Sequence, residues 1–278
     1  MVTAFQICTP APGMPVGMWK SPQSRETAQP FWRGCPFVMK SELSNGDKAI
    51  RVRRMFSRIA PRYDLMNRLM TAGQDVHWRQ EIIRLARLEP GARVLDLGAG
   101  TGDIAREALR QQPECVSVAA DFTLGMMLAG KPRNLRGLVW CAADALNLPY
   151  ADNTFDAVVS GFLLRNVADL PRAIAEQYRV LKPGGRWVAL DTTPPPQNSL
   201  LTPFIRFHMR QVIPLLGEVI TGERDAYVYL PTSSENFLQA ETLAQVVERA
   251  GFREVAFRRY LFGVVAIHRA VKPANSTV

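Results

Sequence analysis

The sequence predicts an α/β protein with a mostly parallel seven-stranded sheet, helices on both faces and an antiparallel C-terminal hairpin. Three observations lead to this fold class. The stretch LDLGAGTGD, residues 95–103, is typical of a strand, a glycine-rich turn and the start of a helix. Strands and helices then alternate, which is typical of a parallel sheet covered on both faces. Two short strands joined by the tight YLFG link close the pattern, and such neighbours are antiparallel.

Composition divides the chain before the glycine turn. Residues 1–47 are rich in Pro, Ser, Gly and Gln and show no periodicity, so we expect a disordered extension; whether residues 1–38 are native is left open, because Met39 is an alternative start. A single domain is expected over 48–278, beginning with helices at 48–88. Their apolar face is formed by Trp78, Ile82, Ile83, Leu85 and Ala86.

The alternating part contains five expected strands, at 93–97, 115–121, 138–144, 154–161 and 186–191. A helix is expected at about 102–111. A later helix has Pro171 at its start and Gly184 past its end, the usual asymmetry of helix termini. The final elements are a helix at 240–250 and the hairpin strands 253–259 and 262–269.

Residues 192–236 interrupt this alternation and are predicted to be an insertion over the ligand-binding edge of the sheet. TTPPP reads as a loop, and the segment at about 200–220 is strongly apolar. It nevertheless carries Arg206, His208 and Arg210, and Pro214 predicts a kink. A core role for this segment is the alternative interpretation.

Composition also limits the partners and the compartment. A formal charge of +9 favours nucleic acid or an anionic membrane surface, unless it serves solubility alone. The four cysteines form no C-x-x-C pair, so we expect free thiols, no metal site and a reducing, cytoplasmic setting. Neither a signal peptide nor an apolar run near the ~18 residues of a membrane span is visible.

The glycine turn indicates which cofactor is bound. A dinucleotide fingerprint requires a third glycine where this chain has Asp103, and a carboxylate at that helix start repels a diphosphate. S-adenosylmethionine carries no phosphate and fits better. Gly98, Gly100 and Gly102 allow the backbone to approach it closely.

Acidic residues follow three successive strands and complete this cofactor site. Asp96 suits the methionine ammonium, and Asp121 lies at the distance typical of a ribose ligand. Asp144, assisted by the backbone of Ala145, suits the adenine amino group. Each acid alone is equally well explained as a cap or turn residue. Three acids beside one glycine turn favour the cofactor.

At this point a family resemblance can be stated. The glycine turn, Asp121 and the hairpin resemble the class I S-adenosylmethionine-dependent methyltransferases, whose fold is Rossmann-like. RYDLMN (62–67), LPYADNTFDAVVSGFLLRNVAD (148–169), RVLKPGGR (179–186) and GVVAIHRAVKP (263–273) resemble the ubiquinone/menaquinone biosynthesis C-methyltransferases. This closer resemblance covers residues 50 to 273.

The resemblance implies methylation of a ring carbon of a polyprenyl quinol. LDTTPP and YVYLPTS look closer to the menaquinone branch, so demethylmenaquinol is the expected substrate, and a methoxy-polyprenyl-benzoquinol is the alternative. Cofactor contacts carried over from the family fall on Thr101, Asp121, Asp144 and Ala145, and on Gly161 with Ser160 beside it. Three positions depart from the family pattern, namely Leu163, Asp191 and Thr232. These departures affect the expected geometry of the substrate site more than cofactor binding.

The mechanism requires an electron-rich ring carbon. We hypothesise that Arg165, Asn166 and Tyr63 surround the ring oxygens and that Arg165 stabilises phenolate charge. The phenolic proton is expected to leave through a water ordered by Tyr63, Asn166 or Asp64. His208 is the alternative base. The prenyl tail favours a peripheral contact with the inner face of a membrane through residues 48–68 and 200–220.

Two other classes of protein were weighed, and a homodimer is left open. A nucleic-acid methyltransferase is disfavoured, because SGFLLRN stands where amino-methylating enzymes carry an acid or Asn before Pro-Pro, and no Pro-Cys pair occurs. Nucleic acid is therefore not an expected partner. A non-catalytic relative is disfavoured by the intact cofactor acids.

Overall fold

The computed structural model describes residues 46–133, 135–195 and 202–274. The expected N-terminal extension, 1–47, lies almost wholly outside these residues. The remainder forms one seven-stranded sheet in the order β3-β2-β1-β4-β5-β7-β6. Strands β1 to β5 are mutually parallel, and β7 runs antiparallel to both of its neighbours, β5 and β6. The predicted fold class is confirmed.

The strands agree with the expected segments except at β5. The first four are β1 (Arg93–Leu97), β2 (Val116–Asp121), β3 (Leu138–Ala142) and β4 (Phe155–Gly161); the last two are β6 (Arg253–Tyr260) and β7 (Val265–Val271). Strand β5 (Leu181–Thr192) begins five residues earlier than expected, because Leu181 already pairs with Phe155 and the amide of Gly184 donates to the Lys272 carbonyl. Helix α6 (Leu170–Val180) is correspondingly shorter.

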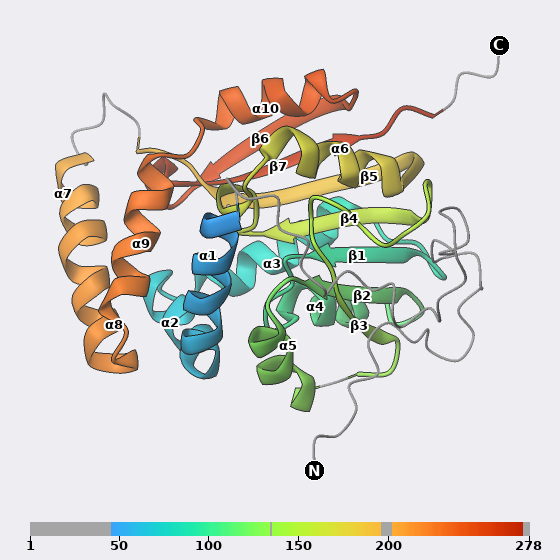
Figure 1. Cartoon of the computed structure of the whole chain (residues 1–278). Helices are drawn as coiled ribbons and strands as arrows, with labels where there is room; N and C mark the ends of the chain where they lie inside the picture. The colour runs from blue at the N-terminus through green and yellow to red at the C-terminus, as the bar shows by residue number, and fades with distance from the viewer. Residues whose placement is uncertain (1–45, 134, 196–201, 275–278) are drawn as a thin grey trace.

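Two apolar layers cover the sheet (Figure 1). Helices α3 (Gln74–Ala86) and α4 (Asp103–Gln111) pack on one face, and their core includes Trp78, Ile82, Ile83 and Ala86, as expected. Helices α6 and α10 (Ala240–Arg249) cover the other face. Helix α5 (Leu124–Gly130) follows β2 and packs against α1.

A third layer lies over the carboxyl ends of the parallel strands, at the left in Figure 1. We call it the helical cap. It comprises α1 (Gly46–Ile59), α2 (Tyr63–Met70), α7 (Thr202–Phe207), a π-helical turn (His208–Val212), α8 (Ile213–Thr221) and α9 (Arg224–Glu235). Met66 and Tyr227 lie in its own small core.

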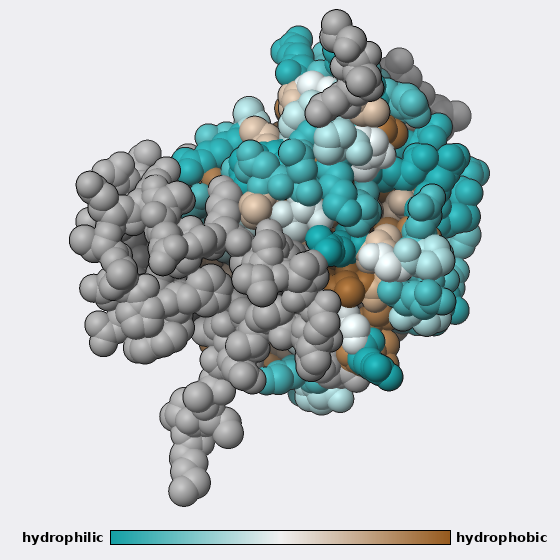
Figure 2. Space-filling view, turned by 90° about the vertical axis from the view of Figure 1, so that its right-hand side faces the viewer, coloured by the Kyte–Doolittle hydropathy of each residue, from teal (hydrophilic) through white to brown (hydrophobic). Residues whose placement is uncertain are grey.

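The opposite side of the molecule, seen in Figure 2, is mostly hydrophilic over the described residues, with small apolar areas. Large exposed apolar side chains instead occur on the cap, on α7 and α8. None of the helices over the described residues is long and apolar enough to span a bilayer.

Candidate active site

The glycine turn after β1 has the backbone geometry that its glycines allow. Gly98, Gly100 and Gly102 have φ of 70°, 57° and 81°, a region that disfavours other residues. The amide of Gly98 donates to the Ala120 carbonyl at 2.8 Å, so the turn is anchored to the end of β2. The first turn of α4 begins directly after it, and the amide of Ala105 in this turn donates to Asp96 of β1.

Asp96 is a buried carboxylate with unused bonding capacity. Its Oδ2 accepts from the amide of Ala105 at 2.9 Å, whereas its Oδ1 is buried and has no hydrogen-bond partner among the described residues. Burial raises the pKa of Asp96 to about 7. Ser160, on the neighbouring strand β4, likewise has a buried Oγ without a partner in the described chain. These two oxygens leave room for a polar ligand beside the turn.

Asp121 and Asp144 follow β2 and β3 but have different surroundings. The Asp121 carboxylate accepts from the amides of Gly100, at 2.7 Å, and Thr123, at 2.6 Å, and burial raises its pKa. Asp144 is half-buried and accepts from the Leu146 amide at 2.9 Å, which is a turn contact. The side chain of Ala145 is buried beside it.

Gly161, at the end of β4, is half-buried next to α4. A Cβ atom at this position would lie 2.8 Å from Cδ1 of Ile104, so a larger residue here would require the end of that side chain to move. The side chain of the adjacent Ser160 is buried.

Thr101 connects the glycine turn to the helical cap. Its hydroxyl donates to Asp64 of α2 at 2.7 Å, and Asp64 pairs with Arg133 at 2.7 Å. Asp103, next to the turn, pairs with three arginines: Arg79, Arg106 and Arg133. The charge of Asp103 is thus neutralised, and its repulsion of a diphosphate is a weaker argument than the sequence indicated.

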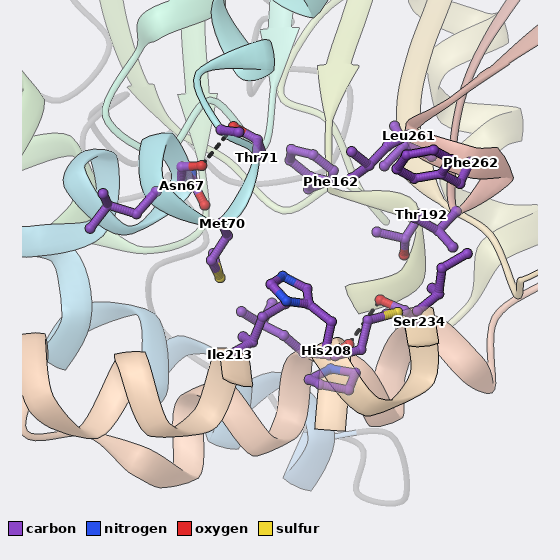
Figure 3. A pocket seen from close by; sticks show the side chains of 18 of the residues that line it. Asn67, Met70, Thr71, Phe162, Thr192, His208, Ile213, Ser234, Leu261 and Phe262 are labelled. Carbon is purple, nitrogen blue, oxygen red and sulfur yellow. Dashed lines mark hydrogen bonds between the residues drawn. The ribbon is translucent and has the colours of Figure 1, made fainter. Parts of the chain in front are cut away.

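A mostly apolar cavity of about 520 Å³ lies between the sheet edge and the cap (Figure 3). Helices α2, α7 and α9, the ends of β4 and β5, and the hairpin loop all contribute to its wall. Its few polar wall residues include Asn67, Thr71, Thr192 and Ser234, which sequence analysis missed because they come from separate helices and strands without a shared motif.

Arg165 lies in the cavity wall and is almost fully buried. Its Nη1 pairs with Oδ1 of Asp191 at 2.6 Å, and the two side chains are only 4% and 2% exposed. The guanidinium also stacks 5.0 Å from the ring centre of Phe162. The family departure at Asp191 thus concerns the residue that holds Arg165 in place.

The other two residues of the expected catalytic group, Tyr63 and Asn166, lie in different surroundings. Tyr63 lines the cavity, and burial raises its pKa. Asn166 donates to the Phe162 carbonyl at 2.8 Å and accepts from the Tyr229 hydroxyl at 3.1 Å. The structure therefore brings Tyr63 and Arg165 into one cavity wall, with Asn166 adjoining Arg165 in sequence and bonded to the cap.

Leu163 contacts the glycine turn, whereas the sequence indicated the substrate side. A Cβ atom on Gly98 would be 2.8 Å from Cδ1 of Leu163, so this side chain covers the glycine turn. It is absent from the cavity wall, which places the family departure on the cofactor side. Among the described residues, no group of three or more His, Cys, Asp or Glu side chains is arranged to hold a metal.

Comparison with known proteins identifies the family to which this chain is similar. Residues 44–272 match the ubiE/COQ5 methyltransferase family. A Ubiquinone/menaquinone biosynthesis C-methyltransferase UbiE of Desulfotalea psychrophila is 48% identical over 80% of this chain and 90% of its own length. A Demethylmenaquinone methyltransferase of Thermus thermophilus is 44% identical over 79% of this chain and 100% of its own.

Solved structures share the fold at lower identity. The [4+2]-cyclase SpnF superposes with a TM-score of 0.58 at 19% identity, covering 81% of this chain and 96% of that one. A Haemonchus contortus phosphoethanolamine N-methyltransferase 2 in complex with S-adenosyl-L-methionine gives 0.54 at 17% identity, covering 71% and 52%. The fold, the glycine turn and the match over residues 44–272 together show that the chain belongs to the ubiE/COQ5 methyltransferase family.

Proposed function

We propose that this enzyme transfers a methyl group from S-adenosylmethionine to a ring carbon of a polyprenyl quinol in menaquinone or ubiquinone biosynthesis. One observation carries the proposal: an apolar cavity of about 520 Å³, suited to a prenylated ring, has a buried arginine in its wall, and another wall residue, Tyr63, lies close to Gly100 of the glycine turn. The relatives named as quinone C-methyltransferases support the same reaction class.

Demethylmenaquinol is the proposed acceptor. Relatives of Thermus and Roseiflexus at 44% and 41% identity carry the name Demethylmenaquinone methyltransferase. The 48% identical relative is named for both pathways, so 2-methoxy-6-polyprenyl-1,4-benzoquinol is the second candidate. A labelled-cofactor assay with both quinols decides: transfer to the naphthoquinol alone supports the menaquinone assignment, and transfer to neither contradicts the proposed function.

The residues at the sheet edge fit the cofactor. In the proposed arrangement the free oxygen of Asp96 accepts from the methionine ammonium, and Asp121 exchanges its bond to the Gly100 amide for the ribose hydroxyls. Asp144 and Ala145 hold the adenine. The remaining contacts are the turn and the end of β4: Gly98, Gly100, Thr101, Gly102, Ser160 and Gly161. Bound here, the cofactor supplies an electrophilic methyl group.

Arg165 is proposed to stabilise the ionised quinol oxygen. Since the ion pair with Asp191 fixes its guanidinium, the positive charge can meet the ring oxygen without a large loss of side-chain entropy. Tyr63 donates a second hydrogen bond from the same cavity wall, and its raised pKa keeps the phenol protonated. Asn166 orients the same strand end through Phe162 and Tyr229.

The part of the cap formed by residues 192–236 is proposed to be the substrate-covering insertion of a domain that spans 48–278. The whole cap is proposed to meet the membrane where the prenyl tail resides. Its basic helix α1 exposes Arg51 and Arg54. Several large apolar side chains of the cap and hairpin are more than 60% exposed: Phe204, Phe207, Leu215, Val219 and Phe262. This combination suits peripheral binding at the inner, anionic leaflet.

Liposome co-sedimentation tests the membrane contact. We expect binding to anionic vesicles at low salt, weaker binding to neutral vesicles, and a marked loss in the Arg51→Glu/Arg54→Glu variant. Equal binding of the variant and the wild type would contradict the role of α1.

A further inference from the structure

The cavity wall contains three titratable side chains among the described residues: Tyr63, Arg165 and His208. Arginine remains protonated in proteins and cannot remove a proton unaided. Burial raises the pKa of Tyr63, so this phenol holds its proton at neutral pH. Histidine is the side chain whose ordinary charge change falls near physiological pH. Acid–base chemistry in this wall therefore points to His208.

The other two histidines of the chain lie away from the cavity. His77 is exposed on α3 and does not contribute to the wall. His268 is buried in β7, where Nε2 bonds the Ala240 carbonyl at 2.9 Å and burial lowers its pKa. His208 is thus set apart from both by its position, and His77 offers a matched control.

Pro214 explains why His208 sits where it does. Proline has no amide hydrogen, and its ring crowds the carbonyl four residues earlier, that of Arg210. The helix responds with a π-helical turn in which the Ile213 amide donates to the His208 carbonyl, five residues back. The expected kink is realised as this wide turn, and the imidazole extends from it into the cavity (Figure 3).

We propose that His208 is the general base that takes the hydroxyl proton of the quinol. The proposal rests on the proposed function and deepens it. His208 is exposed, so the imidazole can carry the charge of the added proton without a large loss of hydration. On the surrounding elements Arg210 pairs with Glu235, and Arg165 pairs with Asp191. The imidazole, Tyr63 and Arg165 together line the cavity in which the ring oxygens are proposed to lie.

The quinol O–H proton moves to the imidazole, and the ring carbon beside the oxygen becomes electron-rich. An electron pair of that carbon forms the new C–CH₃ bond while the S–CH₃ pair stays on sulfur, which leaves a neutral thioether. The hydrogen on the methylated carbon then leaves as a proton to water, and the ring oxygen recovers the proton from His208. One proton is released per methyl group.

The kinetic test compares His208→Gln with His77→Gln. We expect kcat for quinol methylation to fall at least about 100-fold in His208→Gln, the usual scale of a lost general base, and to stay unchanged in His77→Gln. Calorimetric affinity for S-adenosylmethionine should be the same in both. The acid limb of the kcat/KM profile should disappear in His208→Gln, and added imidazole should restore part of the rate of His208→Gly.

A second measurement needs neither turnover nor cofactor. 1-Naphthol, a probe of the quinol ring, is titrated in the presence of each protein, and the naphtholate absorption band is followed. With wild type and His77→Gln the band should appear at lower pH than with His208→Gln. Identical titrations in all three overturn the role of His208, even if quinol methylation itself fails, and equal kcat in His208→Gln and wild type overturns it as well.

Discussion

The sheet edge and the helical cap build the two halves of the site by different physical means. At the sheet edge, backbone amides and buried carboxylates provide polar contacts, and Asp96 and Ser160 retain unpaired oxygens. In the cap, side chains from α2, α7, α8, α9 and the π-helical turn form an apolar wall with few polar groups. The first half is built for one charged molecule. We propose that the second accepts a long apolar tail and that its selectivity rests on Arg165, Tyr63 and His208.

Arg165→Ala should produce the largest effect. It should impair only the substrate half of the site, on the side of the cap. We expect kcat to fall about 1,000-fold, the scale of a lost oxyanion-type donor, because the phenolate loses its charged partner. Calorimetric cofactor affinity should stay within about threefold of wild type. Arg165→Lys is the companion variant, since it keeps a cation beside the buried Asp191. Normal turnover in Arg165→Ala would remove this residue from the mechanism.

Gly130→Ala should impair the cofactor half of the site, at the sheet edge. A Cβ atom on this α5 glycine would collide with the Thr101 carbonyl and displace the glycine turn. Overpacking typically costs about 1–3 kcal/mol, so we expect cofactor affinity to fall about 10-fold to 100-fold. Calorimetry measures it.

Gly217→Ala is the matched variant in the cap. Its Cβ atom would collide with the ring of Tyr227, which is fully buried between α8 and α9. We expect a higher quinol KM with unchanged cofactor affinity. If both glycine variants weakened the same ligand, the two halves would not be separable.

Asp96→Asn tests whether the charge of this buried carboxylate distinguishes the sheet edge from the apolar cap. The Asp96 pKa of about 7 lies above its ordinary 3.8, so the folded, ligand-free protein holds a proton there that the unfolded chain has lost. The Asp96 contribution to the free energy of unfolding therefore falls as pH rises between these two values and is fully lost above pH 7.

Ligand binding should follow the same ionisation. The methionine ammonium needs the charged carboxylate, so wild-type cofactor affinity should rise about tenfold from pH 6 to pH 8. In Asp96→Asn the affinity should be lower and independent of pH in this range. Calorimetry at both pH values, with chemical denaturation of the two proteins in parallel, provides the check. A flat wild-type profile would contradict the pairing.

Leu163→Gly should have the smallest effect. Because Leu163 lies against Gly98, its removal should change cofactor affinity about threefold through lost packing and leave the quinol KM alone. A changed quinol KM with constant cofactor affinity would instead return this residue to the substrate side, as the sequence first indicated.

The sequence predicted the sheet edge much better than the cap. Asp96, Asp121 and the glycine turn lie within one local strand–turn–helix pattern, whose geometry follows from short-range backbone rules. The cap wall joins Asn67, Thr192 and Ser234, which are far apart in the sequence and share no periodic pattern. The pairing of Arg165 with Asp191 also depends on the register of β4 and β5, which no local motif encodes.

Helix α2 belongs to both halves. Its Asp64 accepts from Thr101 of the glycine turn, while Tyr63 and Asn67 face the cavity. Whatever restrains one side of this short helix also restrains the other, and such coupling is reciprocal. We therefore expect the nucleoside and the quinol to change each other's affinity by the same factor, whichever of them binds first.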